Sequence, residues 1–206
     1  KAIGKLMDEL TLTLKSIFDA SSAAVVNPQF GTLRGEYGTW MKVERLGTPN
    51  AGLGSSPSVS EGPNYQIINK RKRGNGSYYV KGHLLNEKLG GTGKQWENLT
   101  PLNRRANGDH ERIAEKRVKK ATAAGALVNY LVEVIYGRSA LTDLTNPTSL
   151  VDQIKLAETE VPTKLICEAE IITPAVYSKT GKEEVSPLIP KGTTILNDIE
   201  RDEYKT

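Results

Sequence analysis

The order of local patterns between residues 65 and 125 constrains the fold of this chain more than any other feature. Two short apolar runs, YQIINK and SYYVKG, have strand character and are joined by RKRGNG, whose Gly-Asn-Gly suits the positive backbone angles of a hairpin turn. A glycine-rich loop and the segment NLTPLNRRANGD follow, and helical apolar spacing then runs from residue 109 to 126. Asn107 or Asp109 is the predicted N-cap of that helix. The predicted order is therefore strand, turn, strand, loop, helix.

The flanking patterns predict an α+β protein. Residues 3–18 place apolar side chains at helical spacing, so residues 1–20 are expected to form an N-terminal helix or the remnant of a linker. We expect residues 21–206 to form one domain with a mixed or antiparallel sheet and flanking helices. The other segments predict strands at 35–47, 127–137 and 164–172, a loop at 48–64 and a short helix at 149–160.

Cysteine and histidine are scarce, which limits the chemistry that the chain can support. The single cysteine, Cys167, lies in an apolar run, so it is expected to be buried, and an internal disulfide or a cysteine-based zinc site is excluded. With only His83 and His110 available, a metal site would depend on oxygen ligands, which favours magnesium or manganese. No apolar stretch approaches the roughly 18 residues that span a membrane, and no signal peptide is visible.

Positive charge gathers around the two histidines. The net charge of +4 is modest, but residues 70–73 and 116–120 form dense basic runs. Such clusters suit a polyanion such as nucleic acid, although a solvated charged face gives the same pattern.

Four residues of this region match the needs of phosphodiester hydrolysis, which are a base, a divalent cation and cationic side chains that hold the polyanion. His83 ends a predicted strand, and the unperturbed histidine pKa of about 6.5 suits a base at neutral pH. Asn107, Glu111 and Glu115 follow at four-residue steps and offer oxygen ligands. The alternatives are a structural histidine at position 83 and a plain helix cap at position 107.

The same stretch resembles the ββα-metal, or His-Me finger, nucleases, and specifically the DNA/RNA non-specific endonuclease family. VKGH ends at His83, NLTP begins at Asn98, Asn107 lies nine residues further on, and Glu115 lies eight beyond that, as in the family. The resemblance covers about residues 65–125. It implies a ββα-metal core in which His83 is the general base, Asn107 binds Mg²⁺ or Mn²⁺, Glu115 orients metal-bound waters and Asn98 supports the catalytic site.

The remaining site candidates are cations expected to bind phosphate and neighbours expected to support the metal site. The cations are Lys81, Lys119 and Arg112, and the neighbours are Glu111 and His110. His110 could be a second metal ligand or a phosphate contact, but a histidine in the first helical turn is expected to face solvent.

The sequence also departs from the family pattern. Val80 and Lys81 stand where the family has Asp-Arg, so Lys81 would supply the cation of that position without the bidentate geometry of arginine, and Leu102 stands in place of Gln. HLLNEKLGG and NLTPL are also similar to the HNH nucleases and to nuclease domains at the C-termini of polymorphic toxins and contractile-injection cargo.

These observations favour a metal-dependent, non-specific endonuclease of DNA or RNA. The resemblance further implies a toxin domain cut from a larger effector, secreted or injected into a target cell, with an immunity protein as partner and no membrane association. Two alternatives remain: a catalytically inactive module that binds nucleic acid or a partner, and a sequence-specific HNH endonuclease.

Overall fold

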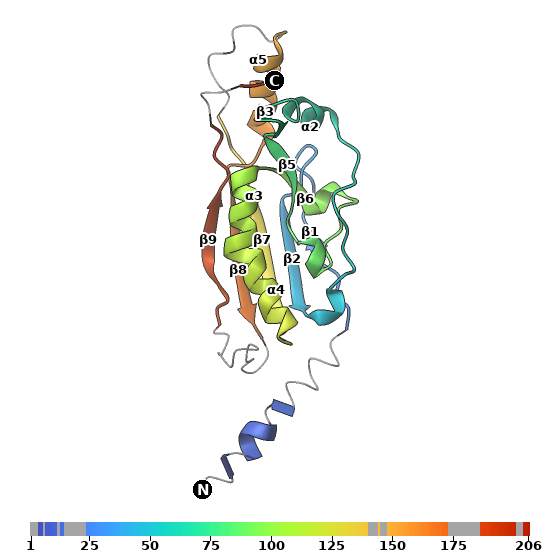
Figure 1. The fold of residues 1–206 in the computed structure, drawn as a ribbon, viewed down its shortest axis with the longest axis vertical. Coiled ribbons are helices and arrows are strands. Elements are labelled where there is room, and N and C mark those ends of the chain that lie inside the picture. The colour runs from blue at the N-terminus through green and yellow to red at the C-terminus, as the bar shows by residue number, and fades with distance from the viewer. Residues whose placement is uncertain are drawn as a thin grey trace.

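The fold was analysed in a computed structural model of the chain. The structure describes residues 4–5, 7–11, 13–14, 24–139, 144, 148–172, 186–200 and 204–206. The described residues between 4 and 14 are helical and exposed, and Figure 1 shows them extending away from the rest of the chain. This confirms helix there, whereas residues 15–18 of the predicted helix lie outside the described residues. None of the described helices combines the length and apolarity that crossing a membrane requires.

A five-stranded sheet forms the body of the protein. Its order is β1 (Gln29–Phe30), β2 (Trp40–Leu46), β7 (Val128–Ile135), β8 (Lys164–Ile171) and β9 (Ile189–Leu196). All four pairings are antiparallel, so the described sheet is antiparallel and not mixed. Burial alternates along β7 and most of β8, as expected of strands with one face on a core, and Cys167 is buried as predicted.

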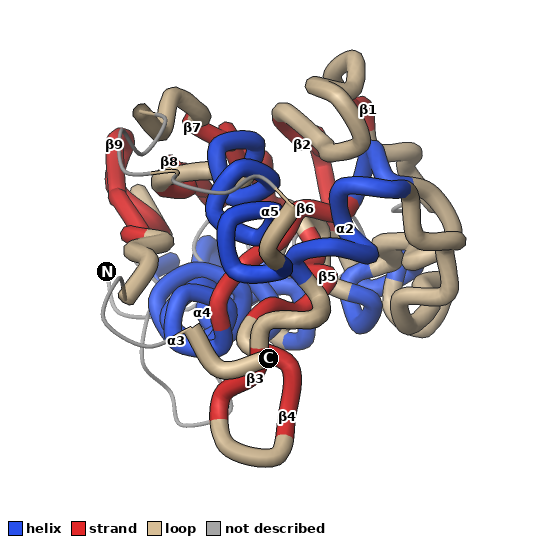
Figure 2. The backbone as a smooth tube through the Cα atoms, turned by 90° about the horizontal axis from the view of Figure 1, so that it is seen from above, coloured by secondary structure: helices blue, strands red, loops and turns tan. Residues whose placement is uncertain are grey.

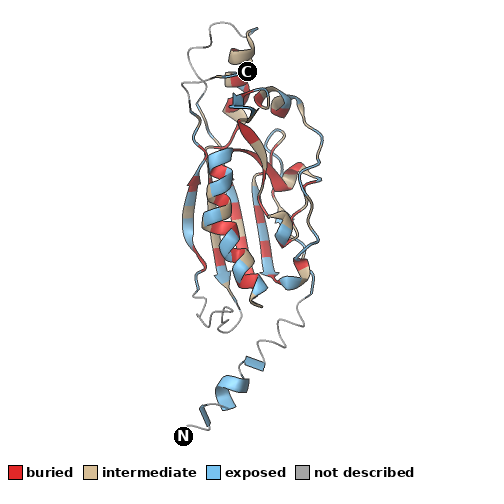
Figure 3. Cartoon of the chain, viewed as in Figure 1, coloured by how far each residue is buried: buried red, intermediate tan, exposed pale blue. Residues whose placement is uncertain are grey.

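One long helix covers a face of this sheet. It consists of α3 (Arg104–His110), a wide π turn (Glu111–Glu115) and α4 (Lys116–Ala123), and Figures 1 and 3 show it lying against the strands with buried and exposed residues interspersed along it. The buried side carries mostly small residues: Ala106, Ala114, Val118 and Ala121. Small side chains let the helix approach the sheet closely, and this fixes the height of its polar residues above the strands.

The ββα unit differs from the prediction in its strands. Its first strand is β5 (Tyr79–His83) and its second is β6 (Leu99–Asn103), which pair antiparallel with His83 opposite Leu99. The segment YQIINK is not a strand, because Pro63–Ile68 forms helix α2. The Glu36 carboxylate accepts hydrogen bonds from the backbone N–H groups of Asn64 and Tyr65, and so caps α2 from a distant part of the chain.

The predicted turn of RKRGNG is confirmed as a small hairpin. β3 (Lys72–Arg73) pairs with β4 (Gly76–Ser77), and Gly74 takes a positive φ of 59° at the turn. Figure 2 shows this hairpin projecting beyond α3.

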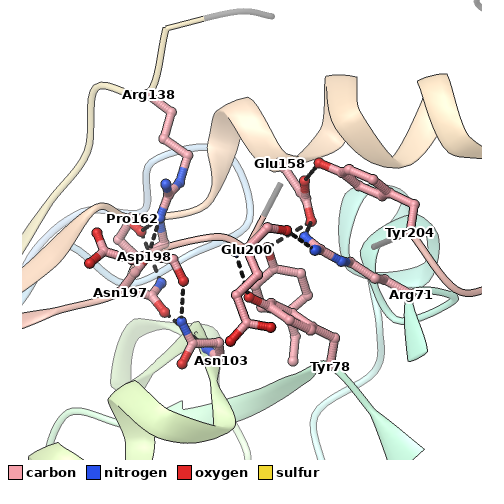
Figure 4. A network of polar contacts seen from close by, with 11 residues as sticks. Arg71, Tyr78, Asn103, Arg138, Glu158, Pro162, Asn197, Asp198, Glu200 and Tyr204 are labelled. Atoms are coloured by element: carbon pink, nitrogen blue, oxygen red, sulfur yellow. Dashed lines mark hydrogen bonds and ion pairs between the residues drawn. The ribbon is translucent and has the colours of Figure 1, made fainter. Parts of the chain in front are cut away.

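The predicted cap of the long helix is also wrong. The N-cap is Asn103, whose side chain accepts a hydrogen bond from the backbone N–H of Ala106, so the helix begins before Asn107. The carbonyl of Asp198 accepts from the Asn103 amide, and the Asn197 side chain accepts from the Asn103 backbone N–H. Figure 4 shows how the C-terminal segment reaches this cap.

A buried arginine anchors the C-terminal segment to the rest of the fold. Arg71 lies between the rings of Tyr78 and Tyr204, donates a hydrogen bond to the carbonyl of Glu200 and forms an ion pair of 2.7 Å with Glu158 (Figure 4). Glu158 follows helix α5 (Leu150–Ala157). Because both members of the ion pair are buried, loss of either one would leave an uncompensated charge in the interior.

Candidate active site

A cavity of about 320 Å³ lies between the β5 hairpin and the long helix. Its walls come from three segments: residues 56–57 of the loop before α2, the β5 strand with the residues that follow it, and the helix. Among the predicted site residues, it brings together Lys81, His83, Asn107, Glu111 and Glu115. Asn98, His110, Arg112 and Lys119 do not line it.

His83, the last residue of β5, is held by a backbone carbonyl. Its Nε2 lies 3.0 Å from the oxygen of Ser55. Because a carbonyl only accepts hydrogen bonds, Nε2 must carry the proton, which leaves the lone pair of the neutral ring on Nδ1. Burial lowers the pKa of His83 below its usual 6.5, partly offset by the hydrogen bond to Ser55, so the ring is neutral at neutral pH. The geometry is that of a histidine prepared to accept a proton at Nδ1.

Asn107 lies on the exposed side of α3, across the cavity from β5. Its Oδ1 comes within 3.1 Å of the point that a β-carbon on Gly82 would occupy. Within the described part of the chain its side chain has no hydrogen-bond partner. The amide oxygen is therefore free to bind a ligand in the cavity.

The π turn keeps the acidic residues on the side of the helix that faces the cavity. A four-residue step slightly exceeds one turn of an α-helix but falls short of one wider π turn. The step from Asn107 to Glu111 therefore goes slightly past one full rotation about the helix axis, and the step from Glu111 to Glu115 falls slightly short of one. The two deviations cancel, and all three residues line the cavity. Because a regular helix would carry Glu115 further round its axis, the π turn explains how it reaches the site.

Glu115 is a buried carboxyl group that contacts Asn86 and His110. Asn86 donates a hydrogen bond of 2.8 Å to its Oε2, and Nδ1 of His110 lies 3.6 Å from its Oε1. Burial, together with nearby Glu111, raises the pKa of Glu115 to about 9. A cation placed beside the two carboxylates would favour the charged form of Glu115.

The expectation that His110 faces solvent is wrong. The side chain is buried, and its Nε2 lies 3.0 Å from the hydroxyl of Tyr130 on β7. Burial lowers the pKa of His110 to about 4, so the ring is neutral at neutral pH and its contact with Glu115 is not an ion pair. His110 therefore packs behind Glu115 on the side away from the cavity.

The donor set suits a hard cation that keeps most of its water. No group of three His, Cys, Asp or Glu side chains arranged for a metal occurs among the described residues. The cavity does offer the Asn107 amide oxygen and the carboxyl groups of Glu111 and Glu115, and a bound cation would favour the charged form of Glu115. Mg²⁺ binds through few protein oxygens and retains several waters, so these residues fit Mg²⁺ and do not fit a zinc centre.

The three cations predicted to bind phosphate are engaged by protein groups. Nζ of Lys119 lies 2.6 Å from both carboxylate oxygens of Glu111, and Arg112 pairs with Asp109 on the outer side of the helix. Lys81 donates to the carbonyl of Val59. A cation missed from the sequence is Lys88, which is exposed and close enough to lower the pKa of Glu111.

Asn98 organises the loop that follows His83. Its Oδ1 accepts from the backbone N–H of Leu85, and its Nδ2 donates to the carbonyls of Leu85 and Thr92. The side chain is fully buried. It therefore supports the site by holding the backbone between His83 and the glycine-rich loop, and it does not line the cavity.

Two supporting groups were missed from the sequence, Asn86 and the Ser55 carbonyl. Asn86 lies in the quoted HLLNEK segment and could have been suspected from its position three residues after His83. The Ser55 carbonyl has no sequence signal, because any residue carries the same backbone oxygen.

A nuclease family model matches the part of the chain that contains the cavity. The model of the DNA/RNA non-specific endonuclease family matches residues 33–147, more than half of the chain. Two crystal structures of NucA from Streptococcus agalactiae, one with no metal bound and one with a magnesium ion bound, align with TM-scores of 0.42 and 0.46. Both are 15% identical and cover 86% of this chain, and 73% and 75% of the NucA chain. No curated protein matches the sequence.

The cavity, with its neutral histidine and its oxygen donors, thus lies within a nuclease fold of the α+β class. The chain belongs to the DNA/RNA non-specific endonuclease family.

Proposed function

We propose that this protein is a metal-dependent endonuclease that hydrolyses the phosphodiester bonds of DNA or RNA with little sequence preference. One observation carries the proposal: the neutral His83 ring, held at Nε2 by the Ser55 carbonyl, shares a cavity with the unengaged amide oxygen of Asn107. A base and a cation ligand are the two groups that this reaction needs most.

In the proposed mechanism, Nδ1 of His83 accepts a proton from a water molecule as that water attacks the phosphorus. The Ser55 carbonyl stabilises the imidazolium that results, because Nε2–H remains its donor. A divalent cation bound at Asn107 would offset charge on the scissile phosphate and on the leaving oxygen. Asn107 would hold that cation through Oδ1, and Glu115 would accept hydrogen bonds from its water shell.

Substrate charge would also be offset by side chains around the cavity. Lys119 lies against Glu111 and reduces the negative charge of that wall. Lys88 is exposed and adjacent, so it is the cation that we assign to a substrate phosphate.

The test incubates purified protein with plasmid DNA and, separately, with total RNA, each with Mg²⁺ and with EDTA, beside His83→Ala. We expect degradation that requires both Mg²⁺ and His83. Comparison of the two reactions would show whether DNA, RNA or both are substrates. Circular dichroism would establish that the variant is folded. Cleavage by His83→Ala at the wild-type rate would contradict the mechanism, and nucleic-acid binding that ignores EDTA and causes no cleavage would favour an inactive binding module.

A toxic role is the finer part of the proposal. The similarity of GHLLNEKLGG and NLTPL to toxin nuclease domains supports an effector that acts in a target cell and is restrained in its producer by an immunity protein. Such a partner would be recovered by co-expression with neighbouring genes. We expect wild-type protein to express poorly alone and His83→Ala to express well, whereas equal yields would count against toxicity.

A further inference from the structure

Residues 55–60, which we call the strap, precede α2, and Ser56 and Pro57 line the cavity. The strap is tied to the glycine-rich loop along its length. The backbone N–H of Ser55 donates to the carbonyl of Gly91, and those of Ser58 and Val59 donate to the carbonyl of Gly93. The hydroxyl of Ser55 accepts from the backbone N–H of Gly93 at 2.9 Å. The strap is thus an ordered piece of backbone that can present its own carbonyls to the hairpin.

Side chains of the ββα unit bind three of those carbonyls. His83 binds the carbonyl of Ser55 at 3.0 Å, Lys81 donates to that of Val59 at 3.0 Å, and Trp96 donates to that of Ser60 at 2.9 Å. Lys81 and His83 are two residues apart on β5, so their side chains leave the same face of the strand. They bind the strap at carbonyls four residues apart, those of Ser55 and Val59.

The Lys81 ammonium group is surrounded by a carboxylate and two aromatic rings of the protein. Its Nζ lies 3.2 Å from Oε1 of Glu61, and the rings of Tyr65 and Trp96 lie 5.2 and 5.8 Å away. The side chain is only 15% exposed. The Lys81 ammonium group thus already has protein partners, whereas Lys88 is exposed.

We propose that Lys81 is a positioning residue, which holds the strap so that the Ser55 carbonyl keeps His83 in the tautomer with a free Nδ1. Its part in catalysis rests on the proposed nuclease function, but its effect on the ring does not. When the strap moves, Nε2 loses its acceptor, and the neutral ring is free to carry its proton on Nδ1 instead. In that tautomer Nδ1 cannot accept a proton from water.

The experiment compares Lys81→Met, Lys81→Arg and the matched control Lys88→Met. The readouts are kcat, KM, the salt dependence of kcat/KM and the ¹⁵N chemical shifts of the His83 imidazole. Lys81→Met should lower kcat roughly 10- to 100-fold, since small misplacements of a reacting group cost about that much. KM and the salt slope should stay at wild-type values. The ¹⁵N shifts should move from the Nε2–H tautomer toward a mixture, and Lys81→Arg should restore part of both changes.

Lys88→Met should behave in the opposite way. Loss of one phosphate contact should raise KM and reduce the salt slope by about one, with kcat and the His83 tautomer unchanged. The inference is overturned if Lys81→Met raises KM and reduces the salt slope as Lys88→Met does, or if the His83 tautomer stays unchanged in Lys81→Met.

Two further controls cover a Lys81→Met variant that does not fold and a wild-type protein that has no nuclease activity. If Lys81→Met does not fold, Trp96→Phe removes the donor to the Ser60 carbonyl but keeps an aromatic ring, and it should shift the tautomer in the same direction. The ¹⁵N measurement needs no turnover. A wild-type protein without activity would therefore refute the proposed function while the tautomer shift still tests Lys81.

Discussion

A β-carbon on Gly82 would lie 3.1 Å from Oδ1 of Asn107. Gly82 precedes His83 on β5, and Asn107 lies one turn into the helix, so strand and helix approach each other closely at the site. The same β-carbon would lie 2.6 Å from Cδ1 of Leu102 on the neighbouring strand. A glycine at this position therefore lets the base and the cation ligand share one small cavity.

Gly82→Ala should consequently weaken cation binding. The added methyl group would push on both the Asn107 amide and the Leu102 side chain, and we expect the apparent affinity for Mg²⁺ to fall about tenfold, which corresponds to about 1.4 kcal/mol. Titration calorimetry with Mg²⁺ measures this. Gly108→Ala is the control, because a β-carbon there meets nothing within 4 Å, and it should slightly stabilise the helix. Equal Mg²⁺ affinity in both variants would contradict the assignment of the cation to Asn107.

Mg²⁺ should stabilise the folded protein through Asn107. A ligand that binds only the native state adds about 2.7 kcal/mol when its concentration is 100 times its dissociation constant. We expect Mg²⁺ to raise the Tm of the wild type, and Asn107→Ala to lose this rise while unfolding at a similar temperature without the cation. Differential scanning calorimetry with and without EDTA measures both. A full Mg²⁺ effect in Asn107→Ala would place the cation elsewhere.

The acid limb of the pH–rate profile should report His83. Burial lowers its pKa below 6.5, so the neutral, proton-accepting form persists to lower pH than in an exposed histidine. We expect the acid limb of kcat/KM at saturating Mg²⁺ to be centred below pH 6.5 and to fall about tenfold per pH unit beyond the lowered pKa. An acid limb centred above pH 6.5 would show that the ring is not buried as described.

His110 should make the protein sensitive to acid. Its pKa is about 4 in the folded state and about 6.5 when unfolded, so the unfolded state binds more protons between those values. The stability it contributes is fully present above pH 6.5 and is lost as pH falls through 4, which amounts to roughly 3 kcal/mol. Urea unfolding at several pH values should show that His110→Gln loses less stability over this range. Parallel curves for the two proteins would contradict the prediction.

Asn98→Ala should lower both the free energy of unfolding and kcat. The change leaves a buried N–H and two buried carbonyls without this partner, and each unsatisfied group costs about 1–3 kcal/mol. We expect a loss of roughly 3 kcal/mol in the free energy of unfolding, measured with urea, and reduced kcat even where the variant is folded. Asn98→Asp should be at least as destabilising as Asn98→Ala, because it places a buried carboxylate oxygen against the carbonyls of Leu85 and Thr92. Wild-type kcat in folded Asn98→Ala would limit Asn98 to a purely structural role.

The parts of this molecule that could be predicted are those whose signals are local. β7 and β8 follow from apolar patterns within their own residues, and the spacing of His83, Asn107 and Glu115 carries over because β6 runs directly into the helix. The cavity that holds these three residues fits that spacing.

What could not be predicted depends on partners far away in the sequence. YQIINK has strand-like residues, but Pro63 and the distant Glu36 carboxylate favour helix α2. His110 looked exposed because a single sequence does not show that Tyr130 of β7 packs against it. The hydrogen bond from Lys81 to the carbonyl of Val59 could not be predicted either, because a backbone carbonyl has no signature in the sequence.

The π turn between Glu111 and Glu115 has a consequence for how this helix can change. Each residue advances an α-helix by about 100°, so a single deletion in the turn would restore regular hydrogen bonding while rotating everything beyond it by about that angle. Glu115 would leave the cavity, and the buried side chains of Val118 and Ala121 would turn away from the sheet. The extra residue sets the rotation of the second half of the helix about its axis. In that rotation one surface packs against the sheet while the adjoining surface carries the groups of the candidate site.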